Sequence, residues 1–269
     1  MNWIYPLTII LYSISVLCYF IDFLYSNRKV NITAFWLLSL VWGTQTFYFI
    51  FQFLFVEEAA FNPLEGLFLY AWLVVTLSLV IHWLVKVDFV IFFTNLVGFI
   101  MMAFSLFSFN QNIPTEMQEL LSSELLWIHI SFIFLAYAAF TLAFACSIMY
   151  IILHHMLKRK KWNKRLQRFG SLHTLNQFAF LATLIAAPLL IVGLIQGMVW
   201  ASVQLEYFYW FDSKVITSII TLLIYLYFLY NRMLKNRTGY DYALLNVIAF
   251  IVLVMNYWLS GQFSNFHLW

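Results

Sequence analysis

Eight long apolar stretches follow one another along this 269-residue chain, and few charged residues interrupt them. Each stretch is long enough to cross the hydrocarbon core of a bilayer as a helix. The chain is 64% apolar and 9% charged, which is too much apolar surface for one water-soluble core. We therefore predict an all-α, polytopic membrane helix bundle that forms a single integral membrane domain over residues 1–269. The predicted spans are 4–25, 33–55, 62–85, 88–109, 125–156, 176–203, 213–233 and 242–261.

The basic residues are concentrated in alternate connections between these spans. All of the 14 lysines and arginines except Lys214 lie there, whereas the opposite connections carry acidic residues such as Glu206 and Asp212. Because basic connections stay in the cytoplasm, we predict that both termini lie outside. The most basic connection, 157–175, is predicted to lie on anionic membrane lipids or to dock a cytosolic partner.

Familiar catalytic patterns are missing from the sequence. It has no HExxH motif and no glycine-rich phosphate loop, so we predict no catalytic residues and no enzymatic activity. The two cysteines, Cys18 and Cys146, lie inside apolar stretches without CxxC spacing, which argues against a thiol–disulfide carrier. No nucleic-acid partner is expected.

Two histidines that are distant in sequence are predicted to lie near the same outer face. His129 begins the fifth span, His267 follows the eighth, and the aromatic connection 206–212 lies on the same side. Two neutral imidazoles from different helices can bind haem iron from opposite faces. We therefore predict a non-covalent, b-type haem with His129 and His267 on its iron. Either histidine alone is also typical of a membrane interface, and zinc bound with Glu206 and Asp212 is a competing hypothesis.

A further histidine, His82, lies near the inner end of the third span. It is a candidate ligand for a second haem, although a histidine that pairs with a backbone carbonyl would fit equally well.

Several ordered motifs in residues 125–269 resemble the cytochrome c assembly family, the CcsA/ResC-like haem-handling membrane proteins. The stretch Gly193 to Ala201, which contains Trp200, resembles the G-x-x-x-G-x-x-W-A pattern of that family. Trp210, Asp212 and Lys214 resemble a reduced form of its tryptophan-rich W-x-W-D-P-K-E signature, and His129 and His267 occupy the places of its external histidines. The resemblance implies that the cofactor-binding residues include His129, His267, Trp200, Trp210 and Asp212.

The chain also departs from the pattern of the family. Val215 replaces the glutamate of the signature, and Tyr230 stands where the family has a transmembrane histidine. His82 therefore lacks its expected partner, although tyrosine can also ligate haem iron and an asymmetric site of His82 and Tyr230 stays open.

A compact eight-span member with a weakened signature resembles a branch of the family that is linked to tetrapyrrole synthesis in Gram-positive bacteria. That resemblance implies a haem-binding regulator or adaptor in the plasma membrane of a bacterium. It would control cytosolic glutamyl-tRNA reductase through the basic connections 157–175 and 231–241. The alternatives are a haem-delivery subunit of a cytochrome c synthase and a haem transporter.

Overall fold

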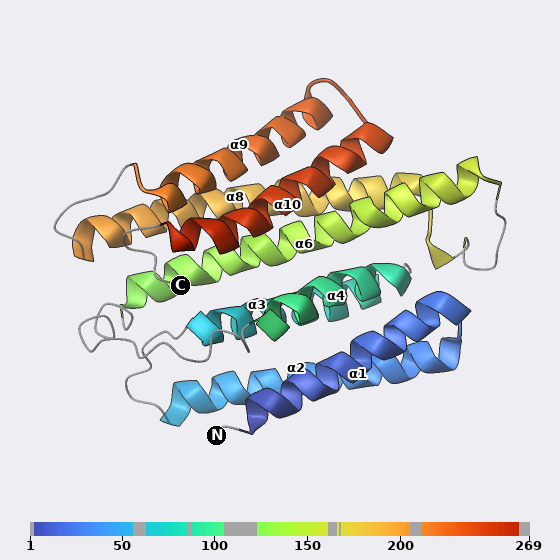
Figure 1. The fold of residues 1–269 in the computed structure, drawn as a ribbon, viewed down its shortest axis with the longest axis horizontal. Helices are drawn as coiled ribbons and strands as arrows, with labels where there is room; N and C mark the ends of the chain where they lie inside the picture. The colour runs from blue at the N-terminus through green and yellow to red at the C-terminus, as the bar shows by residue number, and fades with distance from the viewer. Residues whose placement is uncertain are drawn as a thin grey trace. The chain divides into compact units, whose positions relative to one another are not determined.

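The computed structural model describes residues 3–55, 63–84, 88–104, 123–160, 166, 168–204 and 211–263. Within these ranges the regular structure consists of long α-helices without strands, as the sequence predicts (Figure 1). The helices are α1 (Ile4–Tyr25), α2 (Arg28–Phe55), α3 (Pro63–Leu84), α4 (Asp88–Phe104), α6 (Glu124–Lys158), α8 (Leu172–Gln204), α9 (Ser213–Met233) and α10 (Tyr240–Gln262).

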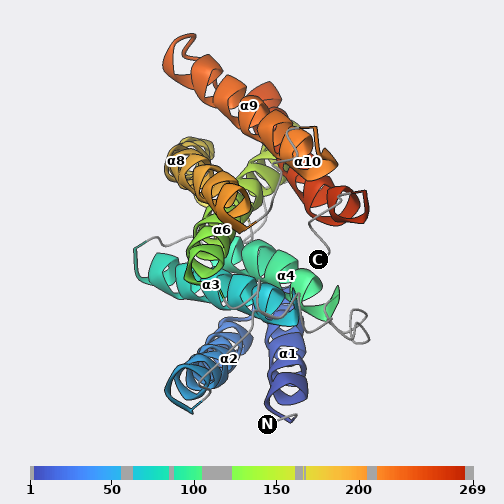
Figure 2. The same cartoon turned by 90° about the vertical axis from the view of Figure 1, so that its left-hand side faces the viewer.

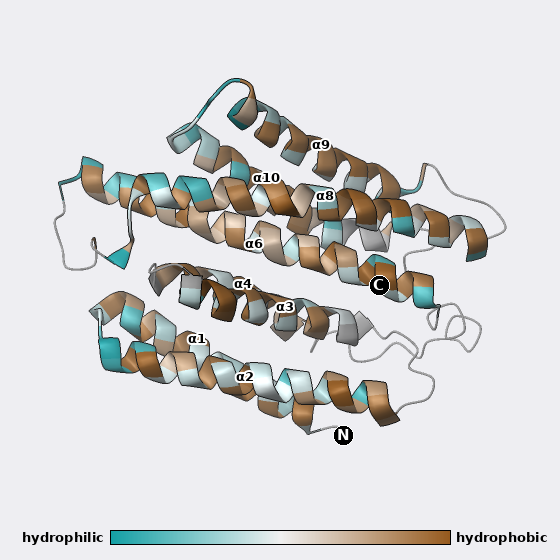
Figure 3. Ribbon diagram, turned by 180° about the vertical axis from the view of Figure 1, so that it is seen from behind, coloured by the Kyte–Doolittle hydropathy of each residue, from teal (hydrophilic) through white to brown (hydrophobic). Residues whose placement is uncertain are grey.

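Seven of these helices are long and apolar enough to cross a membrane, and α4 is a shorter apolar helix. Apolar residues run along the helices, and the polar residues gather near helix ends such as the turn between α9 and α10 (Figure 3). The chain is therefore a multi-pass membrane protein. α2 begins at Arg28 rather than at the predicted residue 33, because polar and basic residues add a turn before the apolar stretch.

The chain folds as two compact units. Unit 1 consists of Met1–Ser122 and Lys160–Gly170, and unit 2 consists of Ser123–Arg159 and Ser171–Trp269. The segment Lys160–Gly170 joins α6 to α8 along the chain, yet it packs with unit 1.

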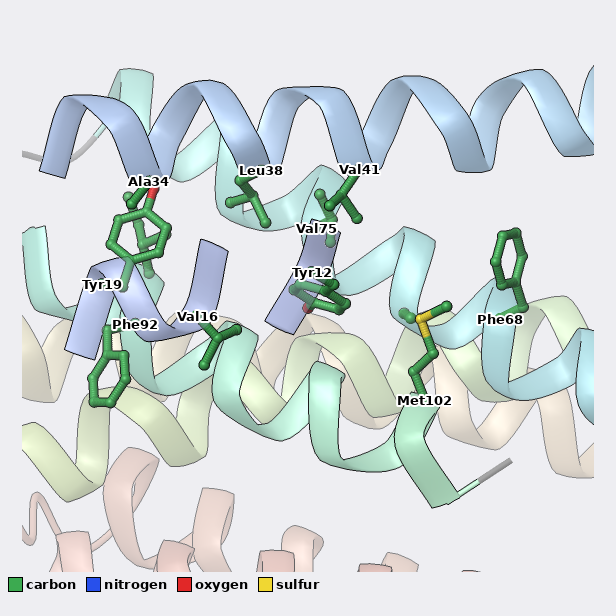
Figure 4. Packing of buried hydrophobic residues seen from close by; sticks show 12 residues of the cluster. Tyr12, Val16, Tyr19, Ala34, Leu38, Val41, Phe68, Val75, Phe92 and Met102 are labelled. Carbon is green, nitrogen blue, oxygen red and sulfur yellow. The ribbon is translucent and has the colours of Figure 1, made fainter. Parts of the chain in front are cut away.

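In unit 1, α1 to α4 form a closed cycle of packed neighbours around an aromatic core. Figure 4 shows Tyr12, Leu38, Val41 and Val75 meeting in this core. The Tyr12 hydroxyl donates a 2.9 Å hydrogen bond to Oδ1 of Asn95, which satisfies both polar groups away from water. Gly98 permits this approach, since a Cβ there would lie 2.6 Å from the Tyr12 oxygen.

A bidentate ion pair fastens Lys160–Gly170 to α1. Nη1 and Nη2 of Arg168 donate to the two carboxylate oxygens of Asp22 at 2.7 and 2.8 Å. Asp22 is only 1% exposed, and Asn31 donates a further 2.9 Å hydrogen bond to its carboxylate. The Arg168 guanidinium also lies 4.8 Å from the centre of the Phe89 ring, and Phe169 packs on the same ring. This fork-to-fork geometry is the strongest form of ion pair that side chains make.

In unit 2, α6, α8, α9 and α10 form a second cycle of neighbours, with α9 and α10 side by side (Figure 2). Phe140 of α6 stacks on Tyr225 of α9 at 3.7 Å between ring centres. Nδ2 of Asn246 in α10 donates to the Ala143 carbonyl at 3.1 Å and to the Ser147 hydroxyl at 2.8 Å in α6. Interhelical hydrogen bonds of this kind stabilise membrane bundles because the alternative is a polar group in hydrocarbon.

Candidate functional site

His129 lies in the second turn of α6 and faces α8. Its Nδ1 is 2.6 Å from the carbonyl oxygen of Gly193, and the ring is half-buried. A carbonyl only accepts, so Nδ1 carries the proton and Nε2 keeps its lone pair. Histidines that bind metals are held in the same way, with one ring nitrogen donating to a carbonyl and the other left for the metal.

Two glycines of α8 make room for this histidine. A Cβ on Gly197 would lie 2.6 Å from Cε1 of His129, and a Cβ on Gly193 would lie 2.7 Å from Cδ1 of Ile133. No real Cβ comes this close to another heavy atom, so both positions need glycine unless their neighbours move. The two glycines therefore allow α8 to pack closely against α6, and the residue packed against Gly197 is the histidine of the predicted site.

Trp200 lies on the same face of α8 as these glycines, because Gly193, Gly197 and Trp200 are spaced four and three residues apart. It is 3% exposed, and its indole nitrogen has no hydrogen-bond partner among the described residues. A buried indole N–H usually finds an acceptor. Its role in cofactor binding stays a prediction.

A hollow of about 70 Å³ opens beside the His129 ring. It lies between three helices of unit 2, and its walls are mainly apolar. The residues that line it are His129, Ile133 and Tyr137 of α6, Leu194, Gly197 and Met198 of α8, and Lys214, Val215, Ser218 and Ile219 of α9. The enclosed volume is that of a few water molecules, so a larger ligand would extend through the open side.

Lys214 brings a positive charge to this hollow. Its Nζ donates a 3.2 Å hydrogen bond to the Asn256 carbonyl and lies 5.6 Å from the centre of the Tyr257 ring. Lys214 and His129 are close enough to interact electrostatically. An apolar wall with one imidazole and one ammonium is a suitable lining for a flat apolar ligand that carries an acidic group.

Asp212 holds the backbone of Lys214 at the start of α9. It is 3% exposed and forms the N-cap of α9, where its carboxylate accepts a 2.8 Å hydrogen bond from the backbone N–H of Lys214. Capping by aspartate fixes where a helix begins. Asp212 thus positions the lysine, while its predicted contact with a cofactor stays a prediction.

Two of the predicted site residues, His267 and Trp210, lie outside the described residues. The last turns of α10 are described, and they pack at the same end of unit 2 as His129, since Asn256 contacts Lys214 and Thr217 of α9. The chain therefore reaches Gln262, a few residues before His267, at the end where His129 lies.

The residues of the predicted inner site fall in different units. His82 of α3 belongs to unit 1, where its ring stacks on Phe35 at 4.4 Å. Tyr230 of α9 belongs to unit 2, is 46% exposed, and contacts the Lys235 ammonium at 5.2 Å from its ring centre. An inner haem on His82 and Tyr230 stays a hypothesis.

The competing zinc site gains no support from the described ranges, which hold no group of three or more His, Cys, Asp and Glu side chains placed for a metal ion. Glu206, one of the proposed zinc ligands, lies outside those ranges. Cys18 and Cys146 are both free. The described residues bring one imidazole to an apolar hollow, whereas a zinc site usually needs three or four protein ligands.

Sequence reasoning missed two parts of this site. It took Lys214 as the one basic residue on the acidic side and gave it no role. It took the stretch Gly193 to Ala201 as a family motif and did not connect its two glycines with His129. The sequence did contain one signal for Lys214. It is the single basic residue on the acidic side of the membrane, and a charged residue at the end of a membrane span often has a function.

The fold and the site define a multi-pass helical membrane protein with a histidine packed against two glycines, and the comparisons with known proteins name its family. Residues 60–267 match the family described as Cytochrome C assembly protein, and the chain belongs to that family.

Within the family, the chain is similar to Protein HemX of Bacillus subtilis (strain 168), with 47% identity over 97% of this chain and 95% of the relative. It is also similar to Protein HemX of Brevibacillus brevis, with 39% identity over 100% of this chain and 98% of the relative. A more distant relative is the Cytochrome c biogenesis protein CcsA of Guillardia theta, with 29% identity over 60% of this chain and 62% of the relative.

Proposed function

We propose that this protein binds one non-covalent, b-type haem at the outer end of unit 2 and acts without chemistry of its own. His129 and His267 would hold the iron, and Trp200, Trp210 and Asp212 would shape the site. The observation that carries the proposal is the 2.6 Å contact between Nδ1 of His129 and the Gly193 carbonyl, which leaves the Nε2 lone pair available on a ring that lines an apolar hollow.

The residues present suit that cofactor. A bound haem would supply a six-coordinate iron centre whose occupancy reports how much haem the cell holds. The side chains of this protein would orient and shield it: Gly197 lets the imidazole sit against α8, and Ile133, Leu194 and Met198 provide an apolar wall. An apolar wall of this kind would pack against the flat face of a macrocycle.

We propose further that the protein is a regulator or adaptor of tetrapyrrole synthesis in the plasma membrane of a bacterium, and that it controls cytosolic glutamyl-tRNA reductase. The high identity to two bacterial HemX proteins over nearly the whole chain supports this branch of the family. The exposed residues Lys158, Arg159 and Lys160 are available to a cytosolic partner or to anionic lipids. Control requires two states of the bundle whose balance haem changes.

The spectrum of the purified protein tests the haem site. The protein in lipid nanodiscs, reconstituted with ferric haem, should give a six-coordinate, low-spin absorption spectrum. His129→Ala and His267→Ala should each change that spectrum, while His173→Ala, which replaces an exposed histidine at the start of α8, should not. A spectrum that is the same in all four proteins would refute axial ligation by this pair.

A second function, haem delivery in cytochrome c maturation, is favoured by one observation: the match to the Cytochrome C assembly family and to CcsA. Deletion of the gene separates the two. Regulation predicts a higher level of glutamyl-tRNA reductase with c-type cytochromes intact, whereas delivery predicts the loss of c-type cytochromes.

A further inference from the structure

The ammonium of Lys214 could bind a group of the ligand that His129 does not bind. Its Nζ has three protons to donate, and the hydrogen bond it makes goes to the Asn256 carbonyl at 3.2 Å. Within the described parts of the chain, the ion pair that the structure contains is Arg168 with Asp22 in unit 1, and Lys214 has no carboxylate within ion-pair distance. The lysine is half-buried between helices, and the carboxylate of Asp212 acts on it electrostatically from beyond ion-pair distance.

The neighbourhood of Lys214 shows where an acidic group of a ligand could contact it. Lys214 lines the same hollow as His129, and so does the adjacent Val215. Val215 places an apolar side chain beside Lys214 in this hollow. Asp212 contributes a negative charge nearby, and its carboxylate accepts a hydrogen bond from the backbone N–H of Lys214 as the helix cap.

We propose that Lys214 binds a carboxylate of the ligand, so that the site selects a porphyrin with free acidic side chains. This inference rests on the proposed function, because it assigns the second contact of the same site. The contact is charge-assisted, and the walls of the hollow beside it are mainly apolar. Lys214 is thus a specificity-determining residue, and His129 is the metal ligand.

The prediction is a difference in affinity between two forms of one ligand. Ferric protohaem carries two free carboxylates, and its dimethyl ester has the same ring and iron without acidic groups. The wild-type protein should bind protohaem more tightly than the ester. Lys214→Met, which keeps the length of the side chain, should weaken protohaem binding by roughly ten- to a hundredfold, as expected for a hydrogen bond to a charged group. Binding of the ester should stay within about twofold, which also shows that the variant is folded.

Two matched variants complete the experiment, with affinities measured by absorbance titration in nanodiscs. Lys214→Arg retains the charge and should recover most of the preference for protohaem. Lys235→Met removes the same charge just after the other end of α9, where the ammonium lies over Tyr230, and should leave both affinities unchanged.

The possible failures are distinct. If the wild type binds protohaem with a spectrum that depends on His129, but Lys214→Met weakens both ligands equally or neither, then the role of Lys214 is wrong and the haem site stands. If the wild type binds neither ligand, the proposed function is wrong and this inference falls with it.

Discussion

Arg168 in unit 1 and Lys214 in unit 2 are both half-buried cations, but they have different partners. Arg168 makes two short hydrogen bonds to a carboxylate that is itself nearly inaccessible, and Asn31 completes the arrangement. Lys214 makes one longer hydrogen bond to a backbone carbonyl and otherwise lines a hollow. A cation that is fully paired inside the protein is structural, whereas one that is left with donors to spare beside a histidine is available to a ligand. The four predictions below test this contrast.

The largest effect is expected from Asp22→Asn. It leaves the Arg168 guanidinium among helices without its carboxylate, and an unpaired buried charge costs about 3 kcal/mol in the free energy of unfolding. Unfolding by titration with a denaturing detergent, followed by tryptophan fluorescence, measures this change. The double variant Asp22→Asn with Arg168→Met should be more stable than Asp22→Asn alone, because the uncompensated charge is gone. Equal stability of the single variant and the wild type would show that Arg168 is not held by this pair.

Gly197→Ala should damage the site in unit 2 without removing any functional group. The new Cβ would lie 2.6 Å from Cε1 of His129, so the ring must turn away from its 2.6 Å contact with the Gly193 carbonyl. Losing the group that orients a metal-binding histidine costs about tenfold or more in affinity for haem. Gly43→Ala is the control, since a Cβ there meets nothing within 4 Å. Unchanged haem affinity in Gly197→Ala would mean that the His129 orientation is unimportant.

A neutral hydrogen bond lies beside the Lys214 contact at the end of α9 that packs against α10. The Thr217 hydroxyl donates to Oδ1 of Asn256 at 2.7 Å. A double-mutant cycle with Thr217→Val and Asn256→Leu should give a coupling energy of about 0.6 kcal/mol, the average for such bonds in membrane bundles. If this coupling energy were as large as the loss of unfolding free energy in Asp22→Asn, the polar contacts of the two units would not differ in strength.

The smallest effect is expected from Lys214→Met on the stability of the ligand-free protein. The variant loses one 3.2 Å hydrogen bond but no longer keeps an ammonium away from water, and these terms nearly cancel. We expect a change within about 0.5 kcal/mol of the wild-type free energy of unfolding. A loss comparable to that of Asp22→Asn would show that Lys214 is a structural cation after all.

The helices could be predicted from the sequence because a bilayer requires long apolar stretches, and all eight were found near their observed bounds. The face shared by His129 and Asp212 could also be predicted, since alternate connections must emerge on the same side. Both residues lie at one end of unit 2, where α6 begins and α9 begins.

The pairings inside the bundle could not be predicted. Asp22 and Arg168 are 146 residues apart, and nothing in one sequence links them. The contact between His129 and Gly193 spans 64 residues and depends on how α6 packs against α8, which apolar periodicity does not specify. Lys214 lay in a recognised motif, but its value as a ligand contact depends on Val215 and Asn256, whose positions only the packed helices reveal.

The Asp22–Arg168 pair also sets a limit on how this chain can be shortened. The family match begins at residue 60, so Arg168 lies inside the shared region and Asp22 lies before it. A fragment trimmed to the family boundaries would keep a guanidinium and lose the carboxylate that neutralises it. A shortened form of the protein should therefore carry a neutral residue in place of Arg168, or keep α1.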